Sequence, residues 1–124
     1  MMRVVIVGGG VAGLALALAL RSQGLDYVLL EQAAEFKPVG AGIQLSPNAT
    51  RTLHYLGILR RLAPRTVQPR CHRFVDWETG RPLLTTPLGD AALEAFGQPY
   101  LHAHRADLLR AILDEIGEDP RVKM

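Results

Sequence analysis

Three glycines and one acidic residue near the N-terminus have the types and spacing needed to hold a ligand. Gly8, Gly10 and Gly13 form the pattern G-x-G-x-x-G, and Glu31 follows them. In this pattern the first glycine permits a tight turn, the second lets a pyrophosphate approach the backbone, and the third lets a helix pack closely on a strand. An acidic residue about 20 positions later accepts hydrogen bonds from ribose hydroxyls. The four residues therefore predict a dinucleotide site.

The segments around the glycines match the elements that must position such a site. Val4-Val5-Ile6-Val7 is a β-branched block typical of a fully buried parallel strand. Residues 14–20 alternate Leu with Ala, which favours a helix, and Gly24 stands where that helix should end. Tyr27–Leu30 is the next strand. The helix N-terminus would then offer free N–H groups and a positive dipole end to the phosphates. We expect nucleotide contacts from Gly8, Gly10, Val11, Ala12, Gly13, Glu31 and Gln32.

The apolar N-terminal run has a second interpretation. Arg3 followed by the uncharged stretch Val4–Leu20 has the outline of a secretory signal. Four glycines inside the stretch, each costing about 1 kcal/mol relative to Ala in a helix, disfavour a regular signal helix. A βαβ unit with an incidental glycine turn also remains open. Glu31 suits NAD or FAD and disfavours the 2′-phosphate of NADP, but the motif does not separate the first two.

Two later segments distinguish FAD from NAD, because together with the glycine motif they resemble a known family. The stretch from Val39 to Ala49, VGAGIQLSPNA, and the stretch from His104 to Leu109, HRADLL, follow the glycine motif in order. Together the three motifs resemble the single-component FAD-dependent aromatic hydroxylases, a family of flavoprotein monooxygenases, and most closely their salicylate hydroxylase-like branch. The resemblance implies that Gly42 and Gln44 pass the flavin, with Gln44 near its ring. It also implies that Arg105 contacts FAD from the start of a helix.

The residues themselves support these two segments. Ser46-Pro47 is a helix start, and Gly57 marks where that helix could end. Gly40 and Gly42 allow close backbone approach to a ligand. From Arg105 to Ile116 the apolar residues have helical spacing, with Gly117 as the cap. Arg105 in the first turn opposes the helix dipole, and a nearby anion such as a pyrophosphate would remove that conflict.

The resemblance also implies a fold and an activity. The fold is α/β, a Rossmann-like βαβ FAD-binding domain over residues 1–124 with a β-hairpin insertion, incomplete at the C-terminus. In the complete family NAD(P)H reduces FAD and molecular oxygen hydroxylates a small aromatic substrate. Family members run to several hundred residues, so we interpret the chain as the N-terminal portion and predict no catalytic residue within it. The alternatives are an NAD-binding fragment of a dehydrogenase and a non-catalytic remnant.

The middle of the chain predicts the hairpin. Arg70–Trp77 and Arg81–Thr85 are expected strands, joined by a turn at residues 78–80. Gly89-Asp90 resembles a second flavin motif but is expected to be a loop and helix start, because the flavin motif comes later in the family. His102 and His104 alternate on a strand without a third ligand nearby, so we predict no metal site. Cys71 and His72 are adjacent and face opposite sides of a strand, which disfavours a nucleophile–base pair.

Composition restricts the setting and the partners. The 124 residues carry a formal net charge of +2 and are 48% hydrophobic, which fits one globular domain. The single cysteine excludes an intramolecular disulfide and favours a reducing cytoplasm. Arg60, Arg61, Arg65, Arg70 and Arg73 make the middle basic without interleaved aromatic residues, so a solvated face is expected rather than a nucleic-acid site. We expect no membrane partner.

Overall fold

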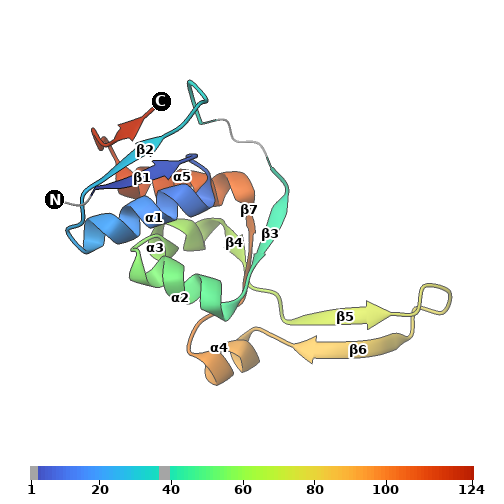
Figure 1. Cartoon of the computed structure of the whole chain (residues 1–124). Coiled ribbons are helices and arrows are strands. Elements are labelled where there is room, and N and C mark those ends of the chain that lie inside the picture. The colour runs from blue at the N-terminus through green and yellow to red at the C-terminus, as the bar shows by residue number, and fades with distance from the viewer. Residues whose placement is uncertain (1–2, 37–39) are drawn as a thin grey trace.

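The computed structural model describes residues 3–36 and 40–124 (Figure 1). Its first unit is β1 (Val4–Val7), α1 (Val11–Ser22) and β2 (Tyr27–Leu30). Strands β1 and β2 pair in parallel, with Val4 opposite Tyr27 and Val7 opposite Leu30. The short strand β8 (Val122–Lys123) pairs in parallel with the other edge of β2. The βαβ unit predicted from the glycine motif is therefore present, and the predicted α/β fold is confirmed.

The prediction that the first strand is fully buried is wrong. Only Ile6 is buried in β1, whereas the side chains of Val5 and Val7 are 58% and 84% exposed. Helices α1 and α5 (Arg105–Ile116) both lie on one side of the parallel sheet (Figure 1). Because side chains alternate between the two faces of a strand, the residues pointing away from these helices stay open to solvent in this chain.

A second sheet is antiparallel and carries the later motifs. Its order is β3 (Gly42–Leu45), β7 (Leu101–His104) and β4 (Thr66–Val67). Ile43 lies opposite Ala103, and Gln44 lies opposite His102. Leu45, Leu101 and Ala103 belong to the buried core. The other face therefore carries Gly42, Gln44, His102 and His104.

Helices α2 and α5 begin where the sequence predicts. Helix α2 (Pro47–Tyr55) follows Ser46, although the Ser46 hydroxyl bonds to the Asn48 side chain rather than to a free backbone N–H. It ends two residues before Gly57, and α3 (Leu59–Leu62) and the short 3₁₀ turn η1 (Ala63–Arg65) follow. Helix α5 has the predicted bounds and buries its apolar stripe, including Leu108 and Ile112. No helix within residues 3–36 and 40–124 is long and apolar enough to span a bilayer.

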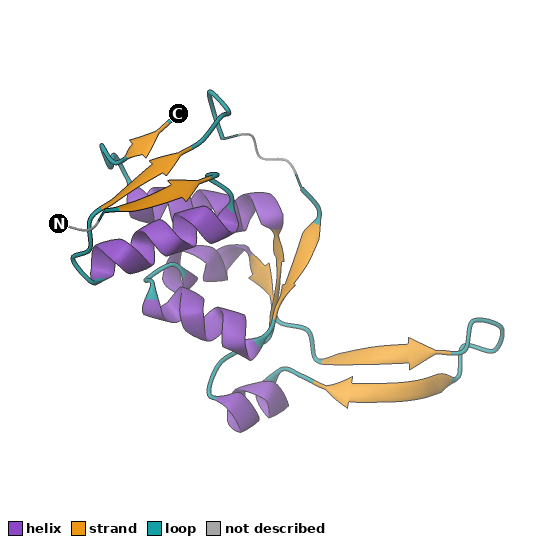
Figure 2. Ribbon diagram, in the orientation of Figure 1, coloured by secondary structure: helices purple, strands orange, loops and turns teal. Residues whose placement is uncertain are grey.

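The predicted hairpin is present and projects from the body of the molecule (Figure 2). Its strands are β5 (Cys71–Val75) and β6 (Pro82–Pro87), paired antiparallel. The first strand is shorter than expected because Asp76 begins the turn, where its carboxylate accepts hydrogen bonds from the backbone and the hydroxyl of Thr79. Helix α4 (Asp90–Phe96) starts after Gly89, as predicted for the Gly89-Asp90 pair.

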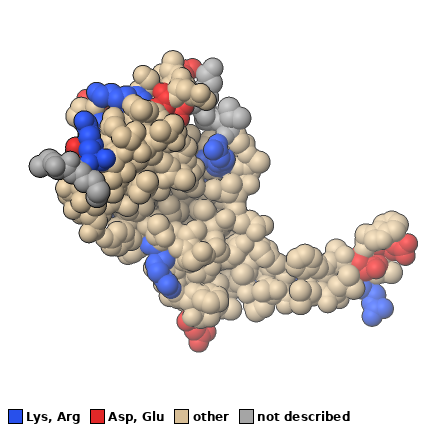
Figure 3. All heavy atoms as spheres, viewed as in Figure 1, with Lys and Arg blue, Asp and Glu red and all other residues tan. Residues whose placement is uncertain are grey.

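Charged side chains are mixed over the surface. On the face shown in Figure 3, Lys and Arg side chains lie in separate groups, several of them beside Asp or Glu. Two of the middle arginines form ion pairs: Arg61 with Glu115 at 2.7 Å and Arg65 with Asp107 at 3.6 Å.

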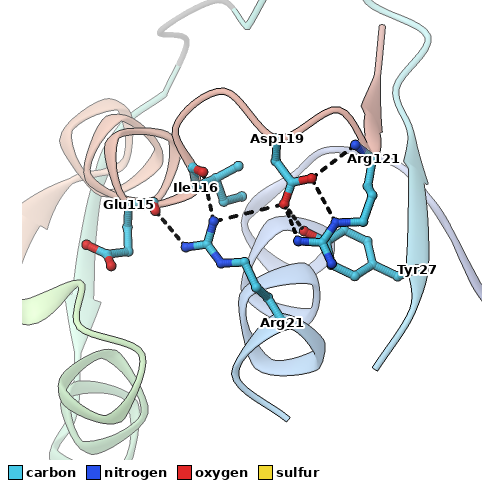
Figure 4. A network of polar contacts seen from close by, with 6 residues as sticks. All are labelled: Arg21, Tyr27, Glu115, Ile116, Asp119 and Arg121. Carbon is cyan, nitrogen blue, oxygen red and sulfur yellow. Dashed lines mark hydrogen bonds and ion pairs between the residues drawn. The ribbon is translucent and has the colours of Figure 1, made fainter. Parts of the chain in front are cut away.

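A polar network fastens the C-terminal segment to the βαβ unit (Figure 4). Asp119, whose side chain is 4% exposed, accepts a hydrogen bond from the Tyr27 hydroxyl at 2.6 Å and two from the Arg121 guanidinium. That guanidinium also lies 4.3 Å from the centre of the Tyr27 ring. Arg21, in the last turn of α1, donates to the carbonyl oxygens of Glu115 and Ile116 at the end of α5. The C-terminal ends of α1 and α5 are thereby held together.

This network predicts a stability that depends on pH at both extremes. Hydrogen bonds from Arg121 hold the pKa of Asp119 well below its usual value, so its contribution is present above about pH 4 and is lost as the pH falls. Burial, with help from Asp119, raises the pKa of Tyr27 to about 12, so its contribution is present below pH 10 and is lost as the pH rises toward 12.

We expect Asp119→Asn to lower the free energy of unfolding by about 2 kcal/mol at pH 7, because charge-assisted hydrogen bonds are lost. The loss of stability as the pH falls below about 4 should be smaller in the same variant. Urea unfolding followed by circular dichroism from pH 7 downward measures both effects. Asp114→Asn, at an exposed position of α5, is the matched control. An unchanged pH profile in Asp119→Asn would contradict the assignment.

Candidate functional site

The glycine turn after β1 is set by one close contact. A Cβ atom on Gly13 would lie 2.0 Å from the carbonyl oxygen of Gly8, so only glycine allows α1 to approach β1 this closely. Gly8 has a φ of +104° and donates its N–H to the carbonyl of Leu30 at 2.8 Å. The turn is thus tied both to the helix that follows it and to the neighbouring strand.

The first turn of α1 presents backbone donors beside open space. The first helical bond runs from the N–H of Leu14 to the carbonyl of Gly10, which leaves the N–H groups of Val11, Ala12 and Gly13 without an intrahelical acceptor. Gly10 caps the helix without a side chain, and a Cβ placed there would meet nothing within 4 Å. The space that a Cβ on Gly10 would occupy is therefore open, which favours the approach of an anion to the start of the helix.

Glu31 holds the same turn from the end of β2. One oxygen of its carboxylate accepts the N–H of Gly9 at 2.6 Å, and the other accepts the N–H of Ala33 at 2.8 Å. These two backbone bonds, that from Ala33 first, lower the pKa of Glu31 below its usual value. Each carboxylate oxygen has a second lone pair, so the anchored group can still accept from ribose hydroxyls. Gln32 follows it at an exposed position.

Two features of the turn were not predicted from the sequence. The bond from Gly9 to Glu31 joins residues 22 positions apart, and no local pattern reveals it. Phe36 packs over the turn, because a Cβ on Gly9 would lie 2.7 Å from its ring. A single aromatic residue in a loop gives no signal of such a contact.

A second glycine segment meets the start of α5. A Cβ on Gly40 would lie 2.9 Å from Cβ of Arg105, and the N–H of Arg105 donates to the carbonyl of Ala41 at 3.0 Å. Gly42 and Gln44 are exposed on β3. The structure therefore brings the Gly40–Gln44 segment to Arg105, as the two later motifs require. Val39, the first residue of that motif, lies outside the described residues.

Helix direction brings the two segments to one end of the molecule. Both α1 and α5 have 12 residues, and the Arg21 bonds join their C-terminal ends. Figure 1 shows both helices running in the same direction, so their N-terminal ends lie together at the other end of the pair, about 18 Å away. Figure 1 shows the N-terminal ends of α1 and α5 on the same side of the molecule, with β3 next to them. The glycine turn and Arg105 consequently flank one region.

The histidines and the cysteine have other surroundings. Nδ1 of His104 accepts the N–H of Ala106 at 3.4 Å and so caps α5. In the part of the chain that the structure describes, no group of three or more His, Cys, Asp or Glu side chains is placed to hold a metal ion. Cys71 is a free thiol at the start of β5.

Comparison with known proteins identifies the family. Residues 1–117 match the family model described as the FAD binding domain. The chain belongs to the FAD-binding domain family. The resemblance inferred from the three motifs is confirmed, FAD is the cofactor of the family, and the dehydrogenase alternative is not favoured.

The relatives of this FAD-binding domain are monooxygenases. The chain is 47% identical over 110 residues to 3-amino-4-hydroxybenzoate 2-monooxygenase of Streptomyces cremeus, covering 89% of this chain and 28% of that protein. It is 38% identical over 122 residues to 3-hydroxybenzoate 6-hydroxylase of Klebsiella oxytoca, covering 98% of this chain and 31% of that one. The chain thus spans less than a third of these relatives.

A solved structure shares the fold. HpxO of Klebsiella pneumoniae, in complex with FAD and uric acid, superposes with a TM-score of 0.80 at 28% identity, covering 98% of this chain and 30% of that one. The FAD-binding domain thus shares the architecture of the matched 30% of a protein that holds FAD.

Two glycine substitutions should separate folding from binding. Gly13→Ala places a methyl group against the carbonyl of Gly8, and we expect it to cost about 2 kcal/mol of unfolding free energy or more. Gly10→Ala has room and should leave stability within about 0.5 kcal/mol, but its methyl group occupies the approach to the free N–H groups, so FAD binding should weaken. Thermal unfolding and FAD titration of both variants measure these effects. Equal stability losses would contradict the assignment.

Proposed function

We propose that this FAD-binding domain is the N-terminal FAD-binding portion of an NAD(P)H- and O₂-dependent flavin monooxygenase that hydroxylates a small aromatic substrate. The observation that carries the proposal is the family match over residues 1–117, joined to a glycine turn with free backbone donors. The relatives named above support the reaction class, since two of them are named as a hydroxybenzoate hydroxylase and an aminohydroxybenzoate monooxygenase.

Each site residue has a role that its position supports. Backbone N–H groups at the start of α1 would bind the pyrophosphate, and Glu31 would accept from the ribose of the adenosine. Arg105 stands in the first turn of α5, where its positive charge opposes the helix dipole and favours an anion close by. Gly42 and Gln44 would lie along the flavin. The proposed FAD contacts are Gly8, Gly10, Val11, Ala12, Gly13, Glu31, Gln32, Gly42, Gln44 and Arg105.

The residues of this chain bind and orient rather than react. Bound FAD would supply the redox and oxygen-transfer chemistry, with NAD(P)H as electron donor. The helix N-terminus and Arg105 would neutralise the pyrophosphate, and the carboxylate of Glu31 would fix the adenosine end. We propose no catalytic acid or base among the 124 residues.

The substrate and the setting belong to the same proposal. HpxO is described in complex with uric acid, a heterocycle, so we propose a small aromatic or heteroaromatic substrate for the whole protein. The lone free thiol of Cys71 is compatible with a reducing cytoplasm, which we propose as the compartment.

Titration of the purified chain with FAD, followed by flavin fluorescence, tests the proposal. We expect saturable binding that NAD does not displace. Glu31→Ala removes the ribose acceptor and both backbone bonds that hold the turn, so we expect the affinity for FAD to fall about tenfold or more. Asp114→Ala, on the exposed face of α5, is the control for loss of an acidic side chain.

Three results would contradict parts of the proposal. Displacement of FAD by equimolar NAD would favour an NAD site. Unchanged affinity in Glu31→Ala would remove Glu31 from the site. A well-folded chain that binds neither FAD nor ADP would make the isolated chain a non-binding remnant.

A further inference from the structure

Three aromatic rings pack together beside Gln44. We call His72, Tyr100 and His102 the ring cluster. His102 lies directly opposite Gln44 in the pairing of β3 with β7, and Tyr100 precedes β7 on the same face, two residues earlier. His72 reaches this face from the start of β5. The cluster therefore lies on the exposed side of the antiparallel sheet, which also carries Gly42 and Gln44.

Each ring of the cluster contacts the other two. The rings of His72 and Tyr100 meet edge to face with their centres 5.2 Å apart. The rings of His72 and His102 are stacked at 6.0 Å, and those of Tyr100 and His102 are 5.9 Å apart at 67°. Such arrangements are favoured by the charge distribution of aromatic rings. The Tyr100 ring is thus held from two sides.

The backbone next to Tyr100 is anchored as well. Thr50 of α2, a fully buried residue, donates its hydroxyl to the carbonyl of Pro99 at 2.8 Å. Pro99, the residue before Tyr100, is therefore fixed to the core by this bond. It restricts the backbone from which the Tyr100 side chain extends.

The hydroxyl of Tyr100 is hydrogen-bonded to the side chain of Gln44. The hydroxyl donates to Oε1 of Gln44 at 2.9 Å. The carbonyl end of the amide thus faces Tyr100.

We propose that Tyr100 is a positioning residue that fixes the Gln44 amide with its two N–H donors directed to the ligand. The inference rests on the proposed function, in which Gln44 lies near the flavin. With Oε1 engaged by Tyr100, Gln44 presents donors only, and its partner must be a hydrogen-bond acceptor. The flavin ring offers such acceptors in its carbonyl oxygens and ring nitrogens. Gln44 thus donates a hydrogen bond to the flavin ring of FAD, in an orientation that Tyr100 sets.

A comparison of FAD with ADP tests this assignment in the chain as it exists. ADP carries the pyrophosphate and the adenosine but no flavin. Tyr100→Phe keeps the ring in the cluster and removes only the hydroxyl, so we expect it to weaken FAD binding about fivefold, the value of one ordinary hydrogen bond. The affinity for ADP should not change. Gln44→Ala should have the same effect, and the double variant should lose no more than either single one.

The chain offers a matched control for the lost hydroxyl. Tyr55, which is 67% exposed on α2, accepts a hydrogen bond from Gln23 at 3.0 Å. Tyr55→Phe therefore breaks a second Tyr–Gln pair remote from Gln44 and should leave both affinities unchanged. Gln44→Glu supplies a side chain of similar shape that accepts but cannot donate when ionised, and it should weaken FAD at least as much as Gln44→Ala.

Each contrary outcome has one meaning. Unchanged FAD affinity in Tyr100→Phe would overturn the positioning role, and equal losses for FAD and ADP would reduce Tyr100 to a structural residue. Additive losses in the double variant would show that the two side chains act separately. A wild-type chain that binds ADP but gains nothing from the flavin would overturn the Gln44 contact alone. A chain that binds neither ligand would overturn the proposed function and this inference together.

Discussion

The contact between α1 and the backbone of Gly8 is the constraint on which the site depends. With no Cβ on Gly13, the helix axis comes close enough to β1 for the N–H groups of its first turn to open directly beside the glycine turn. A helix displaced by one methyl group would carry these donors away from the end of the strand. The close packing of α1 on β1 and the position of these N–H donors therefore both depend on the absence of a Cβ atom at Gly13.

Hydrogen bonds at both ends of α1 maintain this geometry. At the site end Glu31 ties the turn to β2 through the N–H of Gly9. At the far end Arg21 joins the last turns of α1 and α5, while Asp119 links β2 to the segment before β8. Because the two helices run in the same direction and are joined where they end, their N-terminal ends lie on the same side of the molecule. Arg105 and the glycine turn thus face one region although Arg105 lies 92 positions after Gly13 in the sequence.

The side chain of Gln44 is held by neighbouring residues through one hydrogen bond. Its amide oxygen is occupied by Tyr100, whose ring packs against His72 and His102. The alternation of side chains along residues 100–104 places Tyr100 and His102 on one face, so this part of the cluster has a signal in the sequence. The approach of His72 from the hairpin has none, because it depends on how β5 leaves the sheet.

Several of the elements, and the family, could be predicted from the sequence. Glycine spacing, β-branched strands and the apolar stripe of α5 are local patterns, and local backbone preferences govern them, so the βαβ unit and the bounds of α5 were predicted correctly. The faces of the sheets that stay exposed, and the polar groups that bond to one another, could not be predicted in this way. The exposure of Val5 and Val7, the Gly9–Glu31 bond and the Tyr100–Gln44 bond each depend on segments distant in the chain. No local preference encodes such contacts, because packing of the whole chain sets them.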